Sequence, residues 1–562
     1  MRELSVWAPD ADQVEVVLAE SAHPMSRGAG GWWHVAVAVE PDAAYAFSLD
    51  GGDPMPDPQG LRLPDGPDGW SQLFNPGEFV WSDGSWRGVS LQGAVIYELH
   101  VGTFTPEGTL DAAVERLDHV VELGATIVEL LPVTAFPGRH GWGYDGVAPF
   151  AVHEPYGGPA ALQRFVDAAH GRGLGVCLDV VHNHLGPVGS HVPAFGPYLS
   201  DRHETPWGTA LNLDGPGSDP VRRWVLDNVT QWLRDFHVDA LRLDAVHELH
   251  DRRARHLLEE MSAEVDLLAE REGRRLWLIA ESDRNDPRTV TPRGRGEELG
   301  GLGLHAQWAD DVHHALHVAL TGETDGHYAD FASPGALAKV MRSPFFHDGT
   351  WSSHRGHTHG RPVAGASAHG WRFVASLQNH DQVGNRTLGD RLSASLSPGA
   401  LACGAAILLA SPWTPMLFMG EEWGALTPWQ FFTHDTGSQT TDDTDHDTDH
   451  DTDRATYERS KLDWTEPQRE PHARLLRWYA DLIRLRRERP DLHDGRAGRL
   501  EYDPAARTFW MQRGDFLVVV NLSSEVRSFA IDGAVVLSWE PGVEVVEGKL
   551  EVPAECAVIV DE

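Results

Sequence analysis

Cysteine, basic side chains and extended apolar segments are all scarce in this chain. The 562 residues contain only three cysteines, an odd number set far apart, so we expect reduced thiols in a reducing compartment and no disulfide framework. Lysine and arginine total 46 against 84 aspartates and glutamates, and the formal net charge of −38 repels the phosphates of nucleic acids and anionic membranes. A neutral, hydroxyl-rich substrate suits such a protein.

The most apolar segment, ALACGAAILLASPWTPMLFM (400–419), has the length of a membrane span but is interrupted by Pro412 and Pro415. We expect a buried helix followed by a buried strand there. The first residues, MRELSVWAPD, lack the basic and then apolar regions of a secretory signal. The sequence therefore predicts a cytoplasmic protein with neither membrane nor nucleic acid as a partner.

Apolar and aromatic residues are plentiful enough for several cores. With 41% hydrophobic residues and 21 tryptophans, a chain of this length predicts two to four folded domains. The alternating pattern of residues 4–49, followed by a Gly/Pro/Asp-rich connection, predicts an N-terminal β-sandwich of the carbohydrate-binding kind over 1–90. Short strands such as FLVVVNLS (516–523) predict a C-terminal antiparallel β-domain over 491–562.

Strands and helices alternate between these two domains. The expected strands are AVIYELHVGTF (94–104), TIVELLPVT (126–134), GVCLDVVHNH (175–184), ALRLDAV (240–246), LWLIAES (276–282), GLHAQW (303–308), WRFVASLQNH (371–380) and PMLFMGEE (415–422). The expected helices among them cover 109–123, 159–172, 219–236, 252–271 and 398–410. Eight such units predict an α/β fold, a (β/α)8 TIM barrel over 91–490.

Two segments interrupt the barrel pattern. The connection 309–370 is rich in His, Gly and Ser, and we expect it to fold over the catalytic face. The tract TTDDTDHDTDHDTD (440–453) has almost no apolar content, which predicts a mobile, solvated insert. Its aspartate spacing lacks the glycine turn and terminal glutamate of an EF-hand, so we expect no calcium site.

Three of the expected strands run into a carboxylate: Asp244 in ALRLDAVHEL, Glu281 in LWLIAES and Asp381 in VASLQNHDQVGN. The C-terminal ends of the strands form the catalytic face of a barrel. Cleaving a glycosidic bond with retention needs a nucleophilic carboxylate and a carboxylic acid about 5–5.5 Å apart. Each carboxylate alone is compatible with a structural ion pair, but three at ordered strand ends predict a retaining glycosidase.

The segments DVVHNH (179–184), LRLDAVHEL, IAES and QNHDQ resemble, in order, the motifs of the α-amylase clan of retaining glycoside hydrolases. Within that clan, GWGYDG (141–146), IAESDRNDPR (279–288), QWADDVHHALH (307–317), QNHDQVGNR (378–386) and MGEEWG (419–424) resemble the maltooligosyltrehalose trehalohydrolase family. The resemblance covers nearly the whole chain apart from the acidic tract. It implies hydrolysis of the α-1,4 bond that joins a maltooligosyl chain to a terminal trehalose.

The resemblance also implies a role for each carboxylate. Asp244 is the expected nucleophile, Glu281 the general acid and then base, and Asp381 the residue that grips the hydroxyls of the distorted sugar. Asp244 has to be ionised, and Arg242, two residues earlier on the same strand face, favours its charged form. Glu281 has to be protonated, which a drier site near other carboxylates achieves by raising its pKa.

Histidines and an aromatic loop complete the expected sugar site. His182 and His380 lie at strand ends, and the matching histidines of the family donate hydrogen bonds to hydroxyls of the scissile sugar. Tyr144 offers an aromatic face to the sugar ring and Asp145 a hydroxyl acceptor, although both residues are also compatible with merely closing a tight glycine loop.

The residues after the nucleophile depart from the commoner α-amylase pattern. His247 and Glu248 stand where many α-amylases carry Lys and His to contact leaving-group sugars, which fits a changed leaving-group site. A buried salt bridge or a helix-entry role for Glu248 is equally compatible with the sequence.

We expect no cofactor and no metal, because neither the HNH of 182–184 nor the histidines of 354–359 supply a closed ligand set. The resemblance implies maltooligosyltrehalose and related α-glucans as substrates, and a maltooligosyltrehalose synthase as the pathway partner. Two alternatives stay open. One is a 1,4-α-glucan branching enzyme, which transfers the glycosyl unit to a 6-hydroxyl; the other is a catalytically silent carbohydrate-binding barrel, against which the intact set of Arg242 and three carboxylates argues.

Overall fold

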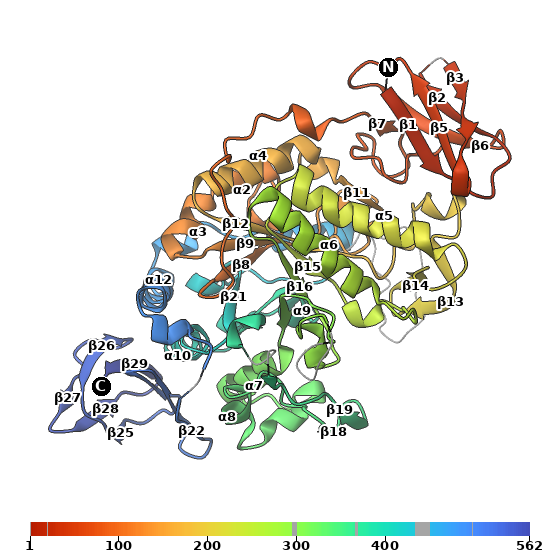
Figure 1. Ribbon diagram of the computed structural model, residues 1–562. Helices are drawn as coiled ribbons and strands as arrows, with labels where there is room; N and C mark the ends of the chain where they lie inside the picture. The colour runs from red at the N-terminus through yellow and green to blue at the C-terminus, as the bar shows by residue number, and fades with distance from the viewer. Residues whose placement is uncertain (1, 20, 295–299, 366–368, 433–449, 497) are drawn as a thin grey trace.

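The computed structural model describes residues 2–19, 21–294, 300–365, 369–432, 450–496 and 498–562. A small β-domain, a closed barrel and a second β-domain follow one another along the chain, and the two β-domains lie on opposite sides of the barrel (Figure 1). Domain boundaries at 90 and 490 stay predictions.

The N-terminal domain is the predicted β-sandwich. One sheet has the order β1 (Arg2–Trp7), β5 (Trp32–Val37), β4 (Ser26–Arg27), and the other β3 (Ser21–Pro24), β2 (Val14–Leu18), β6 (Ala44–Leu49), β7 (Ser71–Gln72). Alternation along the strands buries Val6, Val14 and Val16, each at most 3% exposed.

The predicted TIM barrel is confirmed. Its parallel strands close in the order β8 (Ile96–Leu99), β9 (Ile127–Leu130), β12 (Gly175–Val180), β15 (Ala240–Leu243), β16 (Trp277–Ala280), β17 (Ala306–Trp308), β20 (Phe373–Ser376) and β21 (Thr414–Phe418), which pairs back to β8. Each observed strand falls within or overlaps its predicted segment. The predicted succession of a buried helix and a buried strand over 400–419 is α10 (Pro398–Leu409) and β21.

The helices differ from the prediction at several boundaries. The expected helix 109–123 is two helices, α2 (Leu110–Val114) and α3 (Leu117–Leu123), while α4 (Gly158–Gly171), α5 (Ser218–Thr230) and α12 (His472–Glu488) are continuous. Helix α6 (Leu257–Glu272) begins five residues later than position 252. The cause is Asp251, whose carboxylate accepts the backbone N–H of Leu257 at 2.7 Å and pairs with the buried Arg222, so the chain before the helix is held in a turn.

The connection 309–370 is more regular than a loop. It contains α7 (Asp310–Thr321), α8 (Ala336–Val340) and the hairpin of β18 (Thr350–Ser352) and β19 (His357–His359). It packs beside the segment that follows β16, since Asp311 accepts from the Asn285 amide at 2.8 Å and Arg355 pairs with Asp283. The position near the catalytic face agrees with the prediction.

The acidic tract was expected to be mobile throughout. Residues 440–449 lie outside the described residues, while 450–453 form the first turn of helix α11 (His450–Arg459), so these four residues are helical and their mobility stays a prediction. Tyr457 anchors the helix, because it is buried and donates a hydrogen bond to the Gly102 carbonyl at 2.6 Å. Tertiary packing here overrides a weak local preference.

Inside the barrel, side chains form two layers of opposite character. The first layer is apolar: Ile96, Ile127, Cys177, Ala240, Ile279, Ala306 and Val374. Two residues further along each strand, the second layer is mostly polar: Glu98, Glu129, Asp179, Arg242, Glu281, Trp308 and Ser376. Because side chains alternate along a strand, both layers point inward, and the polar one lies at the C-terminal end of the barrel.

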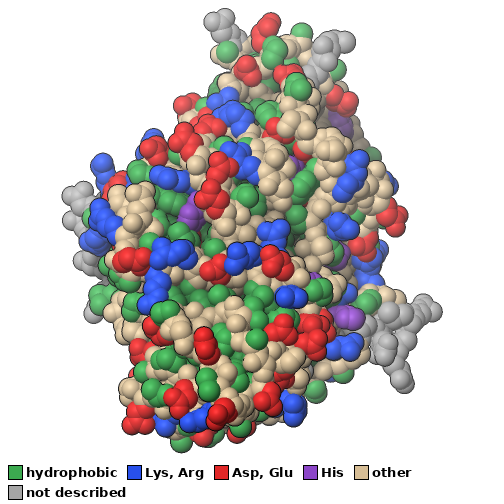
Figure 2. Space-filling model, turned by 90° about the vertical axis from the view of Figure 1, so that its left-hand side faces the viewer, with side chains coloured by type: hydrophobic (Ala, Val, Ile, Leu, Met, Phe, Trp, Pro, Cys, Tyr) green, Lys and Arg blue, Asp and Glu red, His purple; other side chains and the backbone are tan. Residues whose placement is uncertain are grey.

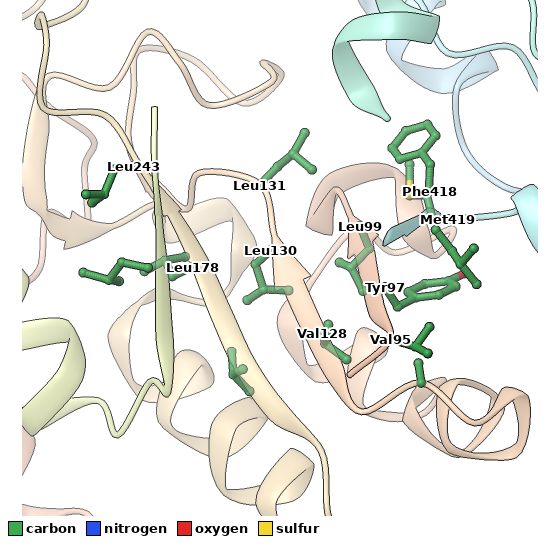
Figure 3. Packing of buried hydrophobic residues seen from close by; sticks show 14 of the residues in the cluster. Val95, Tyr97, Leu99, Val128, Leu130, Leu131, Leu178, Leu243, Phe418 and Met419 are labelled. Atoms are coloured by element: carbon green, nitrogen blue, oxygen red, sulfur yellow. The ribbon is translucent and has the colours of Figure 1, made fainter. Parts of the chain in front are cut away.

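The other face of the same strands carries apolar side chains such as Val128, Leu130 and Leu178, which belong to the main hydrophobic core (Figure 3). The barrel wall is thus fully buried on both faces, as parallel sheets require. Site residues can therefore be held rigidly on it.

The C-terminal domain consists of two antiparallel sheets, as predicted. Their orders are β22 (Leu500–Asp503), β23 (Thr508–Arg513), β24 (Phe516–Asn521), β29 (Cys556–Asp561), β26 (Ala534–Ser538), and β25 (Arg527–Ala530), β28 (Lys549–Val552), β27 (Val545–Val546). Cys177, Cys403 and Cys556 are all buried and unpaired.

The surface shows no field of one charge sign on the face drawn in Figure 2, where acidic and basic side chains are interspersed. Among the helices of the described ranges, none has both the length and the apolar character needed to cross a bilayer. Within the same ranges, no cluster of three or more His, Cys, Asp or Glu residues has a geometry that could hold a metal ion.

A buried carboxylate at the end of the barrel opposite the site predicts a large stability effect. Asp239 is fully buried and accepts from Trp86 at 2.7 Å, from His170 at 2.9 Å and from the backbone of Val176 at 2.9 Å. Asp239→Ala leaves these donors unpaired, so we expect the free energy of unfolding, measured by urea titration, to fall by about 3–5 kcal/mol.

The matched control is Asp118→Ala, which removes a carboxylate whose side chain is 72% exposed and pairs with Arg172 at the surface. We expect its unfolding midpoint to stay close to that of the unmodified protein. Equal midpoints for both variants would contradict the structural role of Asp239.

Candidate active site

The three predicted carboxylates lie at the ends of barrel strands, around the inner polar layer. Asp244 and Glu281 directly follow β15 and β16, whose last residues are paired in register, and Asp381 lies in the first turn of α9 (His380–Gly384), after β20. Arg242 joins the first two, with Nη1 at 2.7 Å from Asp244 Oδ1 and Nη2 at 3.8 Å from Glu281 Oε2. The structure thus brings together the pair predicted from sequence.

Arg242 has no exposed surface and is held on several sides. Its Nη1 donates to both oxygens of Asp179, at 3.0 and 2.9 Å, and its guanidinium lies 4.5 Å from the centre of the Trp308 ring. The second oxygen of Asp244 accepts from the Asn183 amide at 2.9 Å. Two donors therefore fix the orientation of the Asp244 carboxylate, and the bond from the charged guanidinium is the stronger kind.

Glu281 has the opposite environment. Burial raises the pKa of Glu281 to about 8; the Arg242 charge acts against this shift, while Asp244, Asp310 and Asp381 add to it. Asp310 begins α7, so the connection 309–370 contributes a charge to the site. At neutral pH the Glu281 carboxyl is thus mostly protonated, as a general acid requires.

A strained residue connects the two carboxylates. Ala245, directly after Asp244, has φ of 39°, in the left-handed region that residues with a Cβ rarely adopt. In that conformation its N–H donates to Glu281 Oε2 at 2.6 Å, and the N–H of Val246 donates to the Glu281 carbonyl at 3.0 Å. The strain is offset by these two hydrogen bonds, which hold Glu281 against the strand that carries the nucleophile.

Tyr144 and His380 lie together beside the carboxylates. The Tyr144 hydroxyl is 2.6 Å from Asp179 Oδ2 and 2.7 Å from His380 Nε2, and the two rings stack with centroids 5.2 Å apart. His380 Nε2 is also 3.4 Å from Asp381 Oδ2. The Asp381 side chain is 43% exposed, so it is open to a ligand, and the predicted sugar-binding set converges on it.

His182 and Asp145 flank this group differently. The Nε2 of His182 donates to Asn228 Oδ1 at 2.8 Å, and burial lowers its pKa, so the ring is neutral. Its only exchangeable ring proton is then directed into the protein rather than toward a sugar, which favours a supporting role over the predicted donation to substrate. Asp145 is partly exposed and close enough to His184 to influence its pKa.

His247 and Glu248, which follow the predicted nucleophile Asp244, have different surroundings. His247 lines a cleft of about 560 Å³ together with Asp283, Arg284 and Arg355. The carboxylate of Glu248 instead lies 3.1 Å from His250 Nε2, which agrees with the salt-bridge alternative.

Sequence reasoning missed several contributors. Asp179 and Asn183 stand in the DVVHNH segment, which carried the resemblance but gave neither residue a role. Glu98, on the first barrel strand, contacts His380 from a segment with no motif. Trp207, at the tip of the β13 (Leu199–Thr205) and β14 (Gly208–Leu211) hairpin, is 47% exposed and stacks on the ring of His184. Only the fold reveals these neighbours.

Comparisons with known proteins agree with this geometry. Residues 72–192 match the alpha amylase catalytic domain, and residues 2–64 match carbohydrate-binding module 48, the isoamylase N-terminal domain. A crystal structure of a Salmonella typhimurium protein described as an alpha amylase superposes with a TM-score of 0.87 at 32% identity, covering 99% of this chain and 97% of that one. Fold and site together define a glycoside hydrolase of the α-amylase clan.

Relatives over nearly the whole chain narrow this class. The malto-oligosyltrehalose trehalohydrolase of Arthrobacter ramosus is 53% identical over 557 residues, 96% of each chain, and that of Rhizobium sp. (strain M-11) is 50% identical over 581 residues, 99% of this chain and 96% of the relative. The chain belongs to the malto-oligosyltrehalose trehalohydrolase family. A branching enzyme of Corynebacterium jeikeium is 27% identical over 76% of this chain and 61% of its own length.

The predicted roles of Asp244 and Glu281 can be separated by comparing a substrate whose leaving group needs a proton with one whose leaving group does not. We expect Asp244→Asn and Glu281→Gln each to lower hydrolysis of a natural substrate by at least about 10³-fold. Fluoride leaves without a proton, so Glu281→Gln should still release a burst of about one fluoride per protein from an α-maltosyl fluoride before it stalls, whereas Asp244→Asn should release none. Both variants should melt near the unmodified protein; folded variants with near-normal turnover would contradict the assignment.

The raised pKa of Glu281 predicts that activity declines at alkaline pH. A general acid works only while protonated, so kcat/KM should fall about tenfold per pH unit above the pKa of Glu281, which is about 8. Asp310→Asn removes a charge that raises this pKa, so its limb should move toward lower pH. A profile unaffected by Asp310→Asn would show that another group sets the limb.

Proposed function

We propose that this chain hydrolyses the α-1,4-glucosidic bond between a maltooligosyl chain and a terminal trehalose, with retention of configuration. The observation that carries the proposal is the single buried guanidinium of Arg242 that joins Asp244 to Glu281, within a chain 53% identical to a malto-oligosyltrehalose trehalohydrolase. The products are trehalose and a shortened maltooligosaccharide.

In the first step, the Asp244 carboxylate attacks the anomeric carbon while Glu281 gives its proton to the bridging oxygen of the departing trehalose. The carbon–oxygen bond breaks and a glycosyl ester forms on Asp244. In the second step, Glu281, now ionised, takes a proton from water, the water oxygen bonds to the anomeric carbon, and Asp244 leaves as a carboxylate. The raised pKa of Glu281 suits both of its roles.

Residues around the carboxylates bind the reacting sugar in this proposal. Asp381 accepts hydrogen bonds from its hydroxyls, His380 stands beside Asp381 with Nε2 at 3.4 Å from Oδ2, and Tyr144 presents its ring. Arg242 donates a hydrogen bond to Asp244 and orients it, and His182 supports the wall through Asn228.

We propose that the leaving trehalose binds in the cleft that His247 lines. Guanidinium and carboxylate groups of Arg284, Arg355 and Asp283 line this cleft, and such groups bind hydroxyls through paired hydrogen bonds. The histidine at 247, rather than the lysine of many α-amylases, supports a distinct leaving group. Asp145 is a further candidate hydroxyl acceptor, while Glu248 acts through His250.

We also propose a cytoplasmic location, which the three buried, unpaired cysteines support. The substrate has to be made by an enzyme that converts the reducing end of a maltooligosaccharide into trehalose, and we propose a maltooligosyltrehalose synthase as that pathway partner. The N-terminal sandwich, which matches carbohydrate-binding module 48, suits α-glucan handling.

The alternatives are weaker. The branching-enzyme relative is 27% identical, against 53% for the trehalohydrolase, so the comparison does not favour glycosyl transfer to a 6-hydroxyl. A silent binding protein has no need for two carboxylates in contrasting environments.

The test supplies purified protein with maltooligosyltrehalose and, separately, with the maltooligosaccharide of equal length, and follows trehalose, reducing ends and branched products by chromatography. We expect rapid trehalose release and little attack on the plain oligosaccharide. Branched, higher-mass products would establish the branching activity instead, and equal cleavage of both substrates would show a general α-glucan hydrolase.

A further inference from the structure

Glu98 makes two hydrogen bonds to His380, although it lies on β8 and is distant in sequence from the motifs of the site. Its Oε2 accepts the backbone N–H of His380 at 3.0 Å, and its Oε1 lies 2.7 Å from the ring Nδ1. Both side chains are 1% exposed. This two-point contact fixes both the start of helix α9 and the rotation of the imidazole.

The hydrogen bonds that link Asp179, Tyr144 and His380 show which nitrogens of the His380 ring carry hydrogen. Asp179 already accepts from Arg242 with both oxygens, so it is a carboxylate and the hydroxyl of Tyr144 donates to it. That hydroxyl has no second hydrogen to give, so the contact at 2.7 Å between its oxygen and the His380 Nε2 needs a hydrogen on the nitrogen.

The other ring nitrogen faces an acceptor as well. The Oε1 of Glu98 is an acceptor when the carboxylate is ionised, so Nδ1 also carries a hydrogen. An imidazole with both nitrogens protonated is a cation. Its Nε2 is 3.4 Å from Asp381 Oδ2, which places the positive charge beside the carboxylate that meets the substrate.

Among the residues that the structure describes, six charged or titratable groups surround the His380 ring. They are Glu98 on β8, Asp381 on α9, Arg242 on β15, Asp179 on β12, Tyr144 in the loop before β11 (Ala148–Val152), and His100 after β8. Burial lowers the pKa of His380, but Asp381 and Glu98 outweigh burial and Arg242 and raise it to about 9.

We propose that Glu98 is a positioning residue that keeps His380 doubly protonated and holds the resulting positive charge beside Asp381. The inference deepens the proposed function, on which it rests for the identity of the sugar site. Glu98 itself touches neither substrate nor the reacting carboxylates; it acts through the charge and rotation of the imidazole.

A neighbouring glutamate supplies a matched control. Glu129 is paired with Glu98 in strand register, points into the same layer and is 1% exposed, but it makes no contact with His380. Burial, with Glu98 and Asp179, raises the pKa of Glu129 to about 8; Glu129→Gln therefore removes a carboxyl of the same layer that does not hold the His380 ring.

The experiment compares Glu98→Gln and Glu129→Gln with the unmodified protein, using α-maltotriosyl fluoride and fluoride release between pH 5 and 10. This leaving group needs no proton from Glu281, so the alkaline limb of kcat/KM reports the loss of the His380 charge. We expect the limb near pH 9 to move toward acid by about one pH unit or more in Glu98→Gln and to stay in place in Glu129→Gln.

A uniform loss of rate in Glu98→Gln, with the limb unmoved, would overturn the proposal in favour of a merely structural contact. If Glu98→Gln does not fold, the ring nitrogens of the unmodified protein decide: the histidine ¹⁵N signals absent from His380→Asn should show two protonated nitrogens at pH 7.5, and one bare nitrogen would overturn the proposal. Failure of the proposed function is distinct, because the unmodified protein would then release no trehalose from maltooligosyltrehalose, wherever the alkaline limb for fluoride release lies.

Discussion

A single guanidinium buried at the end of a barrel is the constraint on which the rest of the site depends. Arg242 has no exposed surface, and a cation in that position is stable only among anionic partners. Asp179 and Asp244 supply the direct contacts and Glu281 a more distant one. The different distances place the two carboxylates in different environments: Asp244 is hydrogen-bonded to the guanidinium, while burial raises the pKa of Glu281 to about 8.

The neighbouring elements follow from the same constraint. Asp179 is shared between Arg242 and Tyr144, Tyr144 contacts His380, and His380 is held by Glu98, so one polar network runs from the first barrel strand to the nucleophile. The apolar layer beneath and the hydrophobic core outside the wall exclude water, which strengthens each of these contacts.

Strand positions and the two neighbouring strand-end carboxylates could be predicted from local pattern, because a buried parallel strand is a short apolar run and a carboxylate at its end interrupts that run. Helix boundaries were less accessible. The late start of α6 depends on the Asp251 carboxylate, and the helical turn at 450–453 depends on Tyr457 reaching Gly102, a residue about 350 positions away. Contacts of that separation leave no trace in a local window.

The sequence by itself determined the barrel, the flanking β-domains, the acidic character and the three carboxylates, since each is written as composition, periodicity or spacing within a few residues. Only the tertiary structure decided which hydrogen-bond partners the side chains of the site have. It directs the ring proton of His182 to Asn228, pairs Glu248 with His250 and brings Glu98 to His380. The reason is that hydrogen bonding and burial depend on which strands become neighbours, and closing the barrel brings together residues as distant in sequence as 98 and 380.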